Sequence, residues 1–372
     1  MNSETPRKPI VLAVLLVMVG VTLLVVLTIA RRQPPAEIPI AKSVRASTEF
    51  HFKSPPPKVS ASSNPDETRP KVPADPFAAL RLPREQAEAW LAKHHRDAAS
   101  LLAVFRAQND TNYLNEAATN FPNDPRVQLA VLTADVFPAD RRKWLDAFKQ
   151  SSPSNSLADC LSAVNYFKEG KTEAALQDLL AANGKPQFVG HIIENQLDAE
   201  ELYADAGKTA GESAKLGHMN MWSEYGKELP AIKQAAIGIR DVIKAKAEAS
   251  DTGNNVQLVQ LGLGLADKLK SGGTEKLFFS QRVGMATEAI MLNQLDQNTG
   301  YDFLDGQTPA QRLATLKQQR TEWNQLGANW ETAFSQMTDA EQASFYRRTK
   351  ISGDQAALKW LVELHPPTTA QP

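Results

Sequence analysis

Residues 156–189 have the sequence SLADCLSAVNYFKEGKTEAALQDLLAANGKPQFV, and this stretch decides the fold that we expect. Small and apolar residues recur at steps of three and four on either side of Gly170, which is the period of an α-helix. Gly170 follows a charged turn and separates the two periodic halves. The pattern therefore predicts two helices joined by a short turn. Such a hairpin cannot bury its own apolar face and must stack on neighbours.

This stretch resembles one tetratricopeptide repeat, a helix–turn–helix unit of 34 residues. The residues that match the repeat in type and order are Ala163, Tyr166, Gly170, Ala175, Leu179 and Pro186. Ala163 takes the small position where two helices cross, and Gly170 takes the turn. Asp159 and Ser162 depart from the pattern, because the repeat often has Trp and Leu at these two positions.

The resemblance weakens outside this unit. Upstream, from about residue 113, the stretch AATNFPNDP at 117–125 resembles the end of another repeat, and residues 125–155 would be a degenerate one. It is absent beyond about residue 210. We therefore expect repeat-like hairpins over 77–210 and further helices over 211–364. What the resemblance implies is a curved stack whose concave face binds a peptide or a partner's helix. An unrelated all-α bundle is the alternative.

The C-terminal half repeats the helical pattern in longer stretches. Two apolar series run through one segment, the first at positions 256, 259, 263 and 266 and the second at 258, 261, 265 and 269. Two stripes on one helix imply that other helices cover it on two sides. Thr308 and Pro309 have the residue types of an N-cap and a first helical position. No run of alternating residues predicts a strand, so the expected fold class is all-α.

The N-terminus contains an uncharged apolar run, Ile10–Ala30, after a short tail of residues 1–9. As a helix its 21 residues would be about 30 Å long, enough to cross the hydrocarbon core of a bilayer. We predict a single-pass membrane anchor that contacts the lipid bilayer, with a cleaved signal peptide as the alternative. The short tail before it and the long segment after it favour a large domain outside the cytoplasm.

The segment 31–76 contains ten of the chain's 23 prolines. Such a composition cannot bury enough apolar surface to offset its ordering entropy, so we predict a disordered linker. A plain spacer is the simplest function for it. A docking segment for a proline-binding groove and a basic strip on anionic headgroups are the alternatives. The polar tail 365–372 is also predicted to be disordered.

Charge and cysteine content exclude several classes of partner. The formal net charge is −1, and most of the excess basic charge lies in the first 76 residues. The acidic remainder argues against nucleic acid as a partner, since such binding needs clustered positive charge. Cys160 is the only cysteine, which excludes an intramolecular disulfide and a cysteine-based zinc site. Its position in an apolar helix predicts a buried filler.

We predict no catalytic, cofactor-binding or metal-binding residues. His191 and Glu194 have a spacing of three, but no further ligand accompanies them. Gly262 and Gly264 stand inside an apolar helix rather than after a strand, so they predict close helix packing rather than a phosphate loop.

The expected function is that of a membrane-anchored helical-repeat protein without catalysis, which binds another protein or peptide as a scaffold or adaptor. Two alternatives stay open at this point. One is a cell-envelope enzyme whose active site is assembled between helices, and the other is a purely structural spacer.

Overall fold

The structure is a computed structural model that describes residues 80–251, 253–271 and 277–366, with the side chains of 221–231 and 326–332 left out. All described residues belong to one compact unit within residues 71–372. The predicted tail, membrane anchor and linker therefore lie outside the described residues, as does most of the C-terminal tail. Within the described part, no helix combines the length and apolar character needed to span a bilayer.

The all-α prediction is confirmed for the described residues, which contain helices and no strand. The helices are α2 (Arg84–Lys93), α3 (Ala98–Gln108), α4 (Thr111–Asn120), α5 (Pro125–Ala134), α6 (Arg141–Ser151), α7 (Ser156–Lys168), α8 (Thr172–Gly184), α9 (Ile192–Asp205), α10 (Ala210–Glu248), α11 (Asn255–Lys270), α12 (Phe278–Leu292), α13 (Pro309–Ser335), α14 (Asp339–Ser352) and α15 (Asp354–Leu364), with short 3₁₀ turns η2 (Pro138–Asp140) and η3 (Asp302–Leu304).

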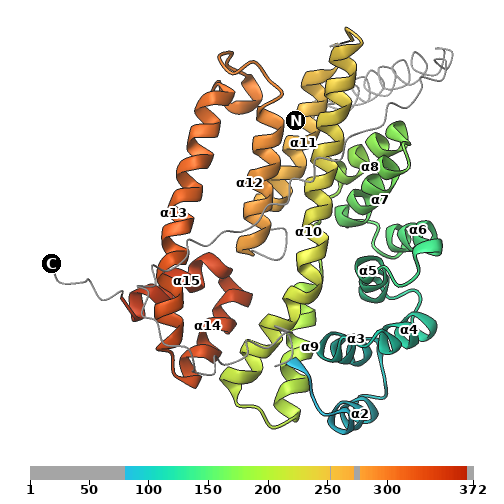
Figure 1. Cartoon of the computed structure of the whole chain (residues 1–372), viewed down its shortest axis with the longest axis vertical. Coiled ribbons are helices and arrows are strands. Elements are labelled where there is room, and N and C mark those ends of the chain that lie inside the picture. The colour runs from blue at the N-terminus through green and yellow to red at the C-terminus, as the bar shows by residue number, and fades with distance from the viewer. Residues whose placement is uncertain (1–79, 252, 272–276, 367–372) are drawn as a thin grey trace, which may run out of the picture. The chain divides into compact units, whose positions relative to one another are not determined.

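The first half of this domain is a series of short helical hairpins (Figure 1). Consecutive helices from α3 to α8 contact one another, and the contact between α7 and α8 is the most extensive. Asp97, Asp124 and Asn155 accept hydrogen bonds from backbone N–H groups at the starts of α3, α5 and α7, so these N-caps fix where the helices begin. The prediction of packed helical hairpins is confirmed. Their assignment as tetratricopeptide repeats stays a prediction.

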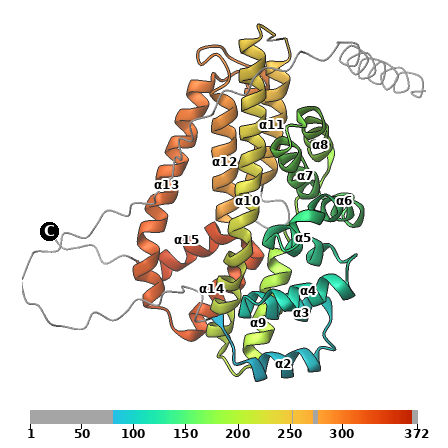
Figure 2. The same ribbon diagram turned by 45° about the vertical axis from the view of Figure 1, so that its right-hand side comes forward.

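Helix α10 is the longest helix of the described chain, with 39 residues. It forms a hairpin with α9 and also packs against α3, α5, α7, α11, α12 and α14. Both ribbon views show it running between the short hairpins and the C-terminal helices (Figures 1 and 2). Thr209 and Glu212 form a complete capping box, which fixes where this helix begins.

The C-terminal helices pack closely around α11 and α12. Helix α11 contacts α8, α10 and α12, so cover on more than one side is confirmed. Both predicted stripes are largely buried, although Val256 at the start of the helix is 40% exposed. Thr308 and Pro309 begin α13 as predicted, with a capping box to Gln311.

Glycines set the distance between α11 and its neighbours. A Cβ at Gly262 would lie 2.2 Å from the sulfur of Met291 on α12, and one at Gly264 would lie 2.2 Å from Oδ1 of Asn183 on α8. The predicted role of both glycines in close helix packing is confirmed.

Candidate functional site

The repeat resemblance singles out six residues, of which five lie in the hairpin α7–α8 and Pro186 lies after it. Ala163, Ala175 and Leu179 are fully buried between the helices. Tyr166 is partly buried against the same core, and Gly170 forms the turn with a φ of +72°, a conformation that favours glycine. Pro186 is exposed in the connection after α8. Five of these residues therefore belong to the core or the turn of the hairpin, and Pro186 does not.

The two departures from the repeat pattern meet in one polar cluster, which we call the α7–α8 ion cluster. It consists of Lys149, Asp159, Ser162, Asp178 and Lys185. Lys149 Nζ lies 2.5 Å from Asp178 Oδ1 and 3.6 Å from Asp159 Oδ1, and Lys185 Nζ lies 2.5 Å from Asp159 Oδ2. Ser162 Oγ donates to Asp178. Two carboxylates and two ammonium groups balance each other, so the cluster fastens α6, α7 and α8 together.

Cys160 lies beside this cluster and is buried. Burial raises the pKa of its thiol to about 12, with Asp159 adding to the effect. A thiol in this state is protonated at neutral pH and therefore a poor nucleophile. The prediction of a buried filler agrees with this environment.

The face formed by the first helices of the hairpins, α3, α5 and α7, is covered by the chain's own helix α10. The α10 residues that share the core with α5 and α7 are almost fully buried; they are Ile232, Ala235, Ala236, Ile239 and Ile243. The resemblance implies an open concave face for a peptide, whereas here this face is part of the core. Periodicity identifies an apolar face but not the helix that will cover it, which explains why sequence analysis missed this packing.

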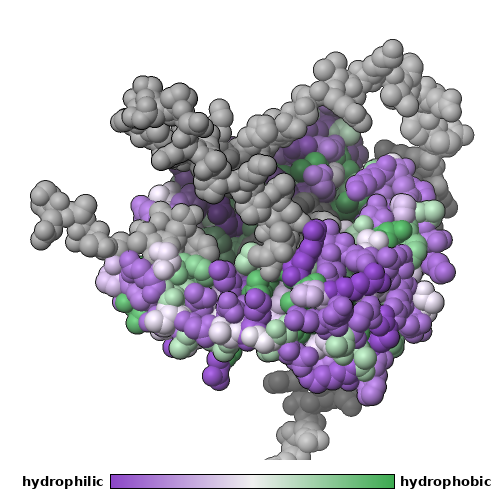
Figure 3. All heavy atoms as spheres, turned by 60° about the horizontal axis from the view of Figure 1, so that its bottom comes forward, coloured by the Kyte–Doolittle hydropathy of each residue, from purple (hydrophilic) through white to green (hydrophobic). Residues whose placement is uncertain are grey.

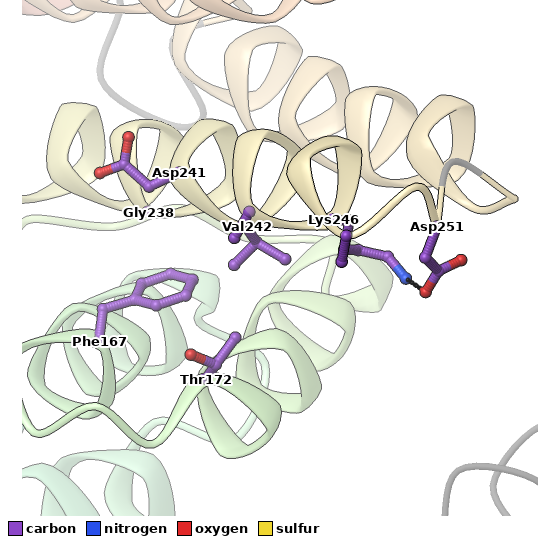
Figure 4. A pocket seen from close by; sticks show the side chains of 9 residues that line it. Phe167, Thr172, Gly238, Asp241, Val242, Lys246 and Asp251 are labelled. Carbon is purple, nitrogen blue, oxygen red and sulfur yellow. Dashed lines mark hydrogen bonds and ion pairs between the residues drawn. The ribbon is translucent and has the colours of Figure 1, made fainter. Parts of the chain in front are cut away.

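An open cleft lies at the edge of this contact, between the α7–α8 hairpin and the C-terminal part of α10. Its volume is about 450 Å³. Phe167 and Thr172 from the hairpin lie opposite Gly238, Val242 and Lys246 of α10 (Figure 4). The remaining lining residues are Asp241, Ala245, Ala249 and Asp251.

Gly238 determines how closely the two walls of this cleft approach. A Cβ at position 238 would lie 2.4 Å from the Phe167 ring, which is far inside van der Waals contact. The ring therefore packs directly on the α10 backbone and closes one end of the cleft. Nothing in the spacing of the sequence pointed to the pair, because 71 positions separate Phe167 from Gly238.

The charged groups of the cleft are paired, and its carboxylates are exposed. Lys246 Nζ lies 2.6 Å from Asp251 Oδ2, and Arg240 lies 2.7 Å from Asp241 Oδ1. The side chains of Asp241 and Asp251 are more than half exposed. The cleft thus has an apolar floor and a charged rim, a combination suited to holding an apolar side chain of a ligand while its polar backbone stays near water.

His191 and Glu194, which the sequence analysis singled out by their spacing, form a local contact. His191 Nδ1 lies 2.6 Å from Glu194 Oε2 at the start of α9. Within the described ranges, no group of three or more His, Cys, Asp or Glu side chains is arranged to hold a metal ion. This contact between the two side chains explains why they are three positions apart, and no bound ligand is needed to explain it.

The face of the molecule seen in Figure 3 is mostly hydrophilic, and its hydrophobic residues form small separate groups. No protein-family model, no curated protein and no solved structure matches this chain. The function therefore has to be argued from the residues and the geometry alone.

Proposed function

We propose that this chain is a membrane-anchored helical scaffold that binds a segment of another protein. The observation that carries the proposal is the open cleft between α7–α8 and α10, with Phe167 and Val242 on its floor and paired charges on its rim. Exposed, neutralised carboxylates suit the rim of a binding surface, whereas acid–base catalysis favours groups shifted by burial or by unpaired neighbours.

The apolar run Ile10–Ala30 supports the anchoring part of the proposal. In this arrangement the helical domain works in water outside the cytoplasm, and the segment 31–76 sets its distance from the bilayer. Sodium carbonate extraction of membranes tests the anchor, because a bilayer-spanning helix stays in the pellet. Release of the uncleaved chain into the supernatant would contradict it. Protease access to tags at both ends tests the orientation.

Site-specific photocrosslinking tests the cleft. A photoreactive residue in place of Thr172 should capture one recurrent partner from native membranes, while the same residue in place of Gln318, which is exposed on α13, should not. Equal capture at both positions would count against a specific site.

A pair of charge substitutions on α10 sharpens this test. Ala245 lines the cleft and is exposed, so Ala245→Glu should place a charge in the cleft and reduce capture at Thr172 about tenfold or more. Ala247 is exposed on the same helix but does not line the cleft, so Ala247→Glu is the matched control. If both variants reduce capture equally, the partner does not bind in the cleft.

A further inference from the structure

Helices α14 and α15 pack as a hairpin against the end of α13, with a small hydrophobic cluster between them (Figures 1 and 2). The start of α14 and the end of α15 lie together, since His365 Nε2 is 3.6 Å from Glu341 Oε1. At the opposite end, Gly353 joins the two helices. We call the part of the hairpin around this glycine, residues 347–360, the α14–α15 tip.

The carboxylates of the hairpin lie away from this tip or are buried. Asp339 and Glu341 belong to the first turn of α14, and Glu363 belongs to the last turn of α15. Asp354 is the only carboxylate within residues 347–362. It is 8% exposed and accepts a hydrogen bond from the start of α12. The hairpin therefore contributes no exposed carboxylate to the surface of the tip.

Three exposed cations lie at the tip, namely Arg347 and Arg348 on α14 and Lys359 on α15. None of them forms an ion pair with another described side chain. Lys350 differs from these three, because it contacts Glu200 and is mostly buried. About 9–12 Å of helix separate Arg347 from the acidic first turn of α14, more than the Debye length of about 8 Å at physiological ionic strength. The tip thus presents positive charge to the solvent.

Apolar side chains accompany these charges. Ile351 is 69% exposed, the highest value among the exposed large hydrophobic side chains of the described residues. It follows Arg347 by four positions and Arg348 by three, so the three residues share one face of α14. Across the hairpin, the guanidinium of Arg348 lies 4.6 Å from the centroid of the Trp360 ring. Exposed cations beside an aliphatic residue and a tryptophan suit the interface of an anionic membrane, where headgroups attract the cations and both apolar side chains leave water.

A hollow of about 230 Å³ begins at Ser352, the residue after Ile351. Its lining consists of Gln281 from α12 and of Ser352, Gly353, Gln355, Ala356 and Lys359 from the hairpin. The hydroxyl, amide and ammonium groups of this lining can all donate hydrogen bonds, and the described lining contains no carboxylate. These donors suit the phosphate of a lipid headgroup.

We propose that the α14–α15 tip docks on an anionic phospholipid surface, with Ile351 in the interfacial region and the cations of the tip against the headgroups. Complementary charge selects this occupant, and the exposed Ile351 explains why the contact is with a membrane rather than with a dissolved anion. The proposal goes beyond the binding of a partner protein and does not depend on it, because the tip and the cleft share no residue.

Vesicle flotation of the full chain tests this proposal. The chain is held in nanodiscs of phosphatidylcholine, which cover the apolar run, and is mixed with vesicles of phosphatidylcholine alone or with an equal part of phosphatidylglycerol. A chain that stays outside the nanodiscs is mixed with the vesicles directly, so that failure of the anchor leaves the test intact. We expect flotation with the anionic vesicles only, and about tenfold weaker binding when the ionic strength rises from about 0.1 M to about 0.5 M. Equal flotation with both kinds of vesicle, or none with either, would overturn the proposal.

Substitutions locate the surface that binds. Arg347→Glu replaces an attractive charge by a repulsive one and should weaken binding to the anionic vesicles about tenfold or more. Arg320 on α13 is also exposed and forms no ion pair with a described side chain, so Arg320→Glu is the matched control and should bind like the parent chain. Ile351→Ser should weaken binding several-fold, because it removes apolar surface from the contact.

Two results would assign the tip differently. Equal losses in Arg347→Glu and Arg320→Glu would mean that the overall charge of the chain drives the binding, and they would overturn the proposal. Self-association that grows with protein concentration, that Arg347→Glu abolishes and that occurs without flotation would assign the tip to the acidic end of the hairpin in a second copy. That result would overturn it as well.

Discussion

The α7–α8 ion cluster and the C-terminal helices solve the same problem, buried charge, in different ways. In the cluster, two lysines face two aspartates, and Lys149 lies within reach of both acids. In the C-terminal helices, Glu288 on α12 is a buried carboxylate between two cations, Lys270 and Arg312, each at 2.6 Å, and Lys270 also lies 2.7 Å from the exposed Asp267. The two regions therefore differ, because Lys149 keeps a buried carboxylate when one partner is lost, whereas Lys270 keeps only an exposed one.

The C-terminal region contains buried groups that should make its stability depend on pH. Burial lowers the pKa of His218 on α10 to about 4, with Lys350 adding to the effect, and raises the pKa of Asp354 on α15 to about 6. Burial alone would raise the pKa of Glu288, but hydrogen bonds and charges from Arg312 and Lys270 outweigh it and lower the pKa. These groups should therefore contribute to the pH dependence of stability.

The largest expected effect comes from a substitution in the core of the α7–α8 hairpin. Leu179 is fully buried, so Leu179→Ala should lower the free energy of unfolding by about 2–5 kcal/mol. Leu180, the next residue, is 62% exposed, and Leu180→Ala should change it by less than about 0.5 kcal/mol. Urea unfolding of the full chain, followed by circular dichroism, gives both values. Similar losses in the two variants would mean that α8 is rotated relative to the structure.

The second prediction concerns His218. Its folded pKa of about 4 lies below the ordinary histidine pKa of 6.5, so the unfolded chain binds more protons between these pH values. Stability from this group is therefore present above pH 6.5 and is lost as the pH falls toward 4, by about 1.4 kcal/mol per pH unit at most. His218→Phe should remove this loss, which unfolding measurements at pH 6.5 and 4.5 would detect as a smaller difference than in the parent chain.

Asp354 should make stability depend on pH in the opposite direction. Its folded pKa of about 6 lies above the ordinary aspartate pKa of 3.8, so the folded chain binds more protons between these pH values. Stability from this group rises as the pH falls from 6 toward 4. The carboxylate accepts from the backbone N–H of Phe278 at 3.0 Å, and Asp354→Asn keeps an acceptor there. The variant should therefore lose more stability on acidification than the parent chain. If the difference in stability between the variant and the parent chain does not change with pH, Asp354 is hydrated in the folded state.

Much of the fold was predictable from the sequence, because it depends on local signals. Gly170 at a turn, Thr308 at a helix start and the two glycines of α11 all act through their own neighbours, and the structure places them accordingly. Two prolines also stand at helix starts, since Pro83 is the N-cap of α2 and Pro138 begins a 3₁₀ turn before α6.

The candidate sites were not predictable, because they join residues that lie far apart in the sequence. Phe167 meets Gly238 only because α10 folds back over the hairpins. The motif departures at Asp159 and Ser162 were visible, yet their meaning depends on Lys185 and Asp178, which belong to other elements. Periodicity gives no information about such partners.

A further prediction measures the difference in charge balance directly. Glu288→Gln leaves Arg312 without its carboxylate partner and Lys270 with only the exposed Asp267, and we expect a loss of about 2–3 kcal/mol, less than for fully buried cations because both are partly exposed. Asp178→Asn leaves Lys149 with Asp159, and the expected loss is about 1 kcal/mol. Equal losses at pH 7 would contradict the idea that the α7–α8 ion cluster is the more tolerant of the two.

The smallest expected effect concerns the two sides of α11. This helix faces the C-terminal helices through Gly262 and the α7–α8 hairpin through Gly264. Gly262→Ala would press on Met291, which is fully buried and has no room to move, so we expect a loss of about 1–2 kcal/mol. Gly264→Ala would meet the side chain of Asn183, which is exposed and can turn away. The gain in helix propensity, up to about 1 kcal/mol, should then offset the energetic cost of this contact. Thermal unfolding of the two variants decides the matter: a lower midpoint for Gly264→Ala than for Gly262→Ala would mean that the hairpin, not α12, limits how closely α11 can pack.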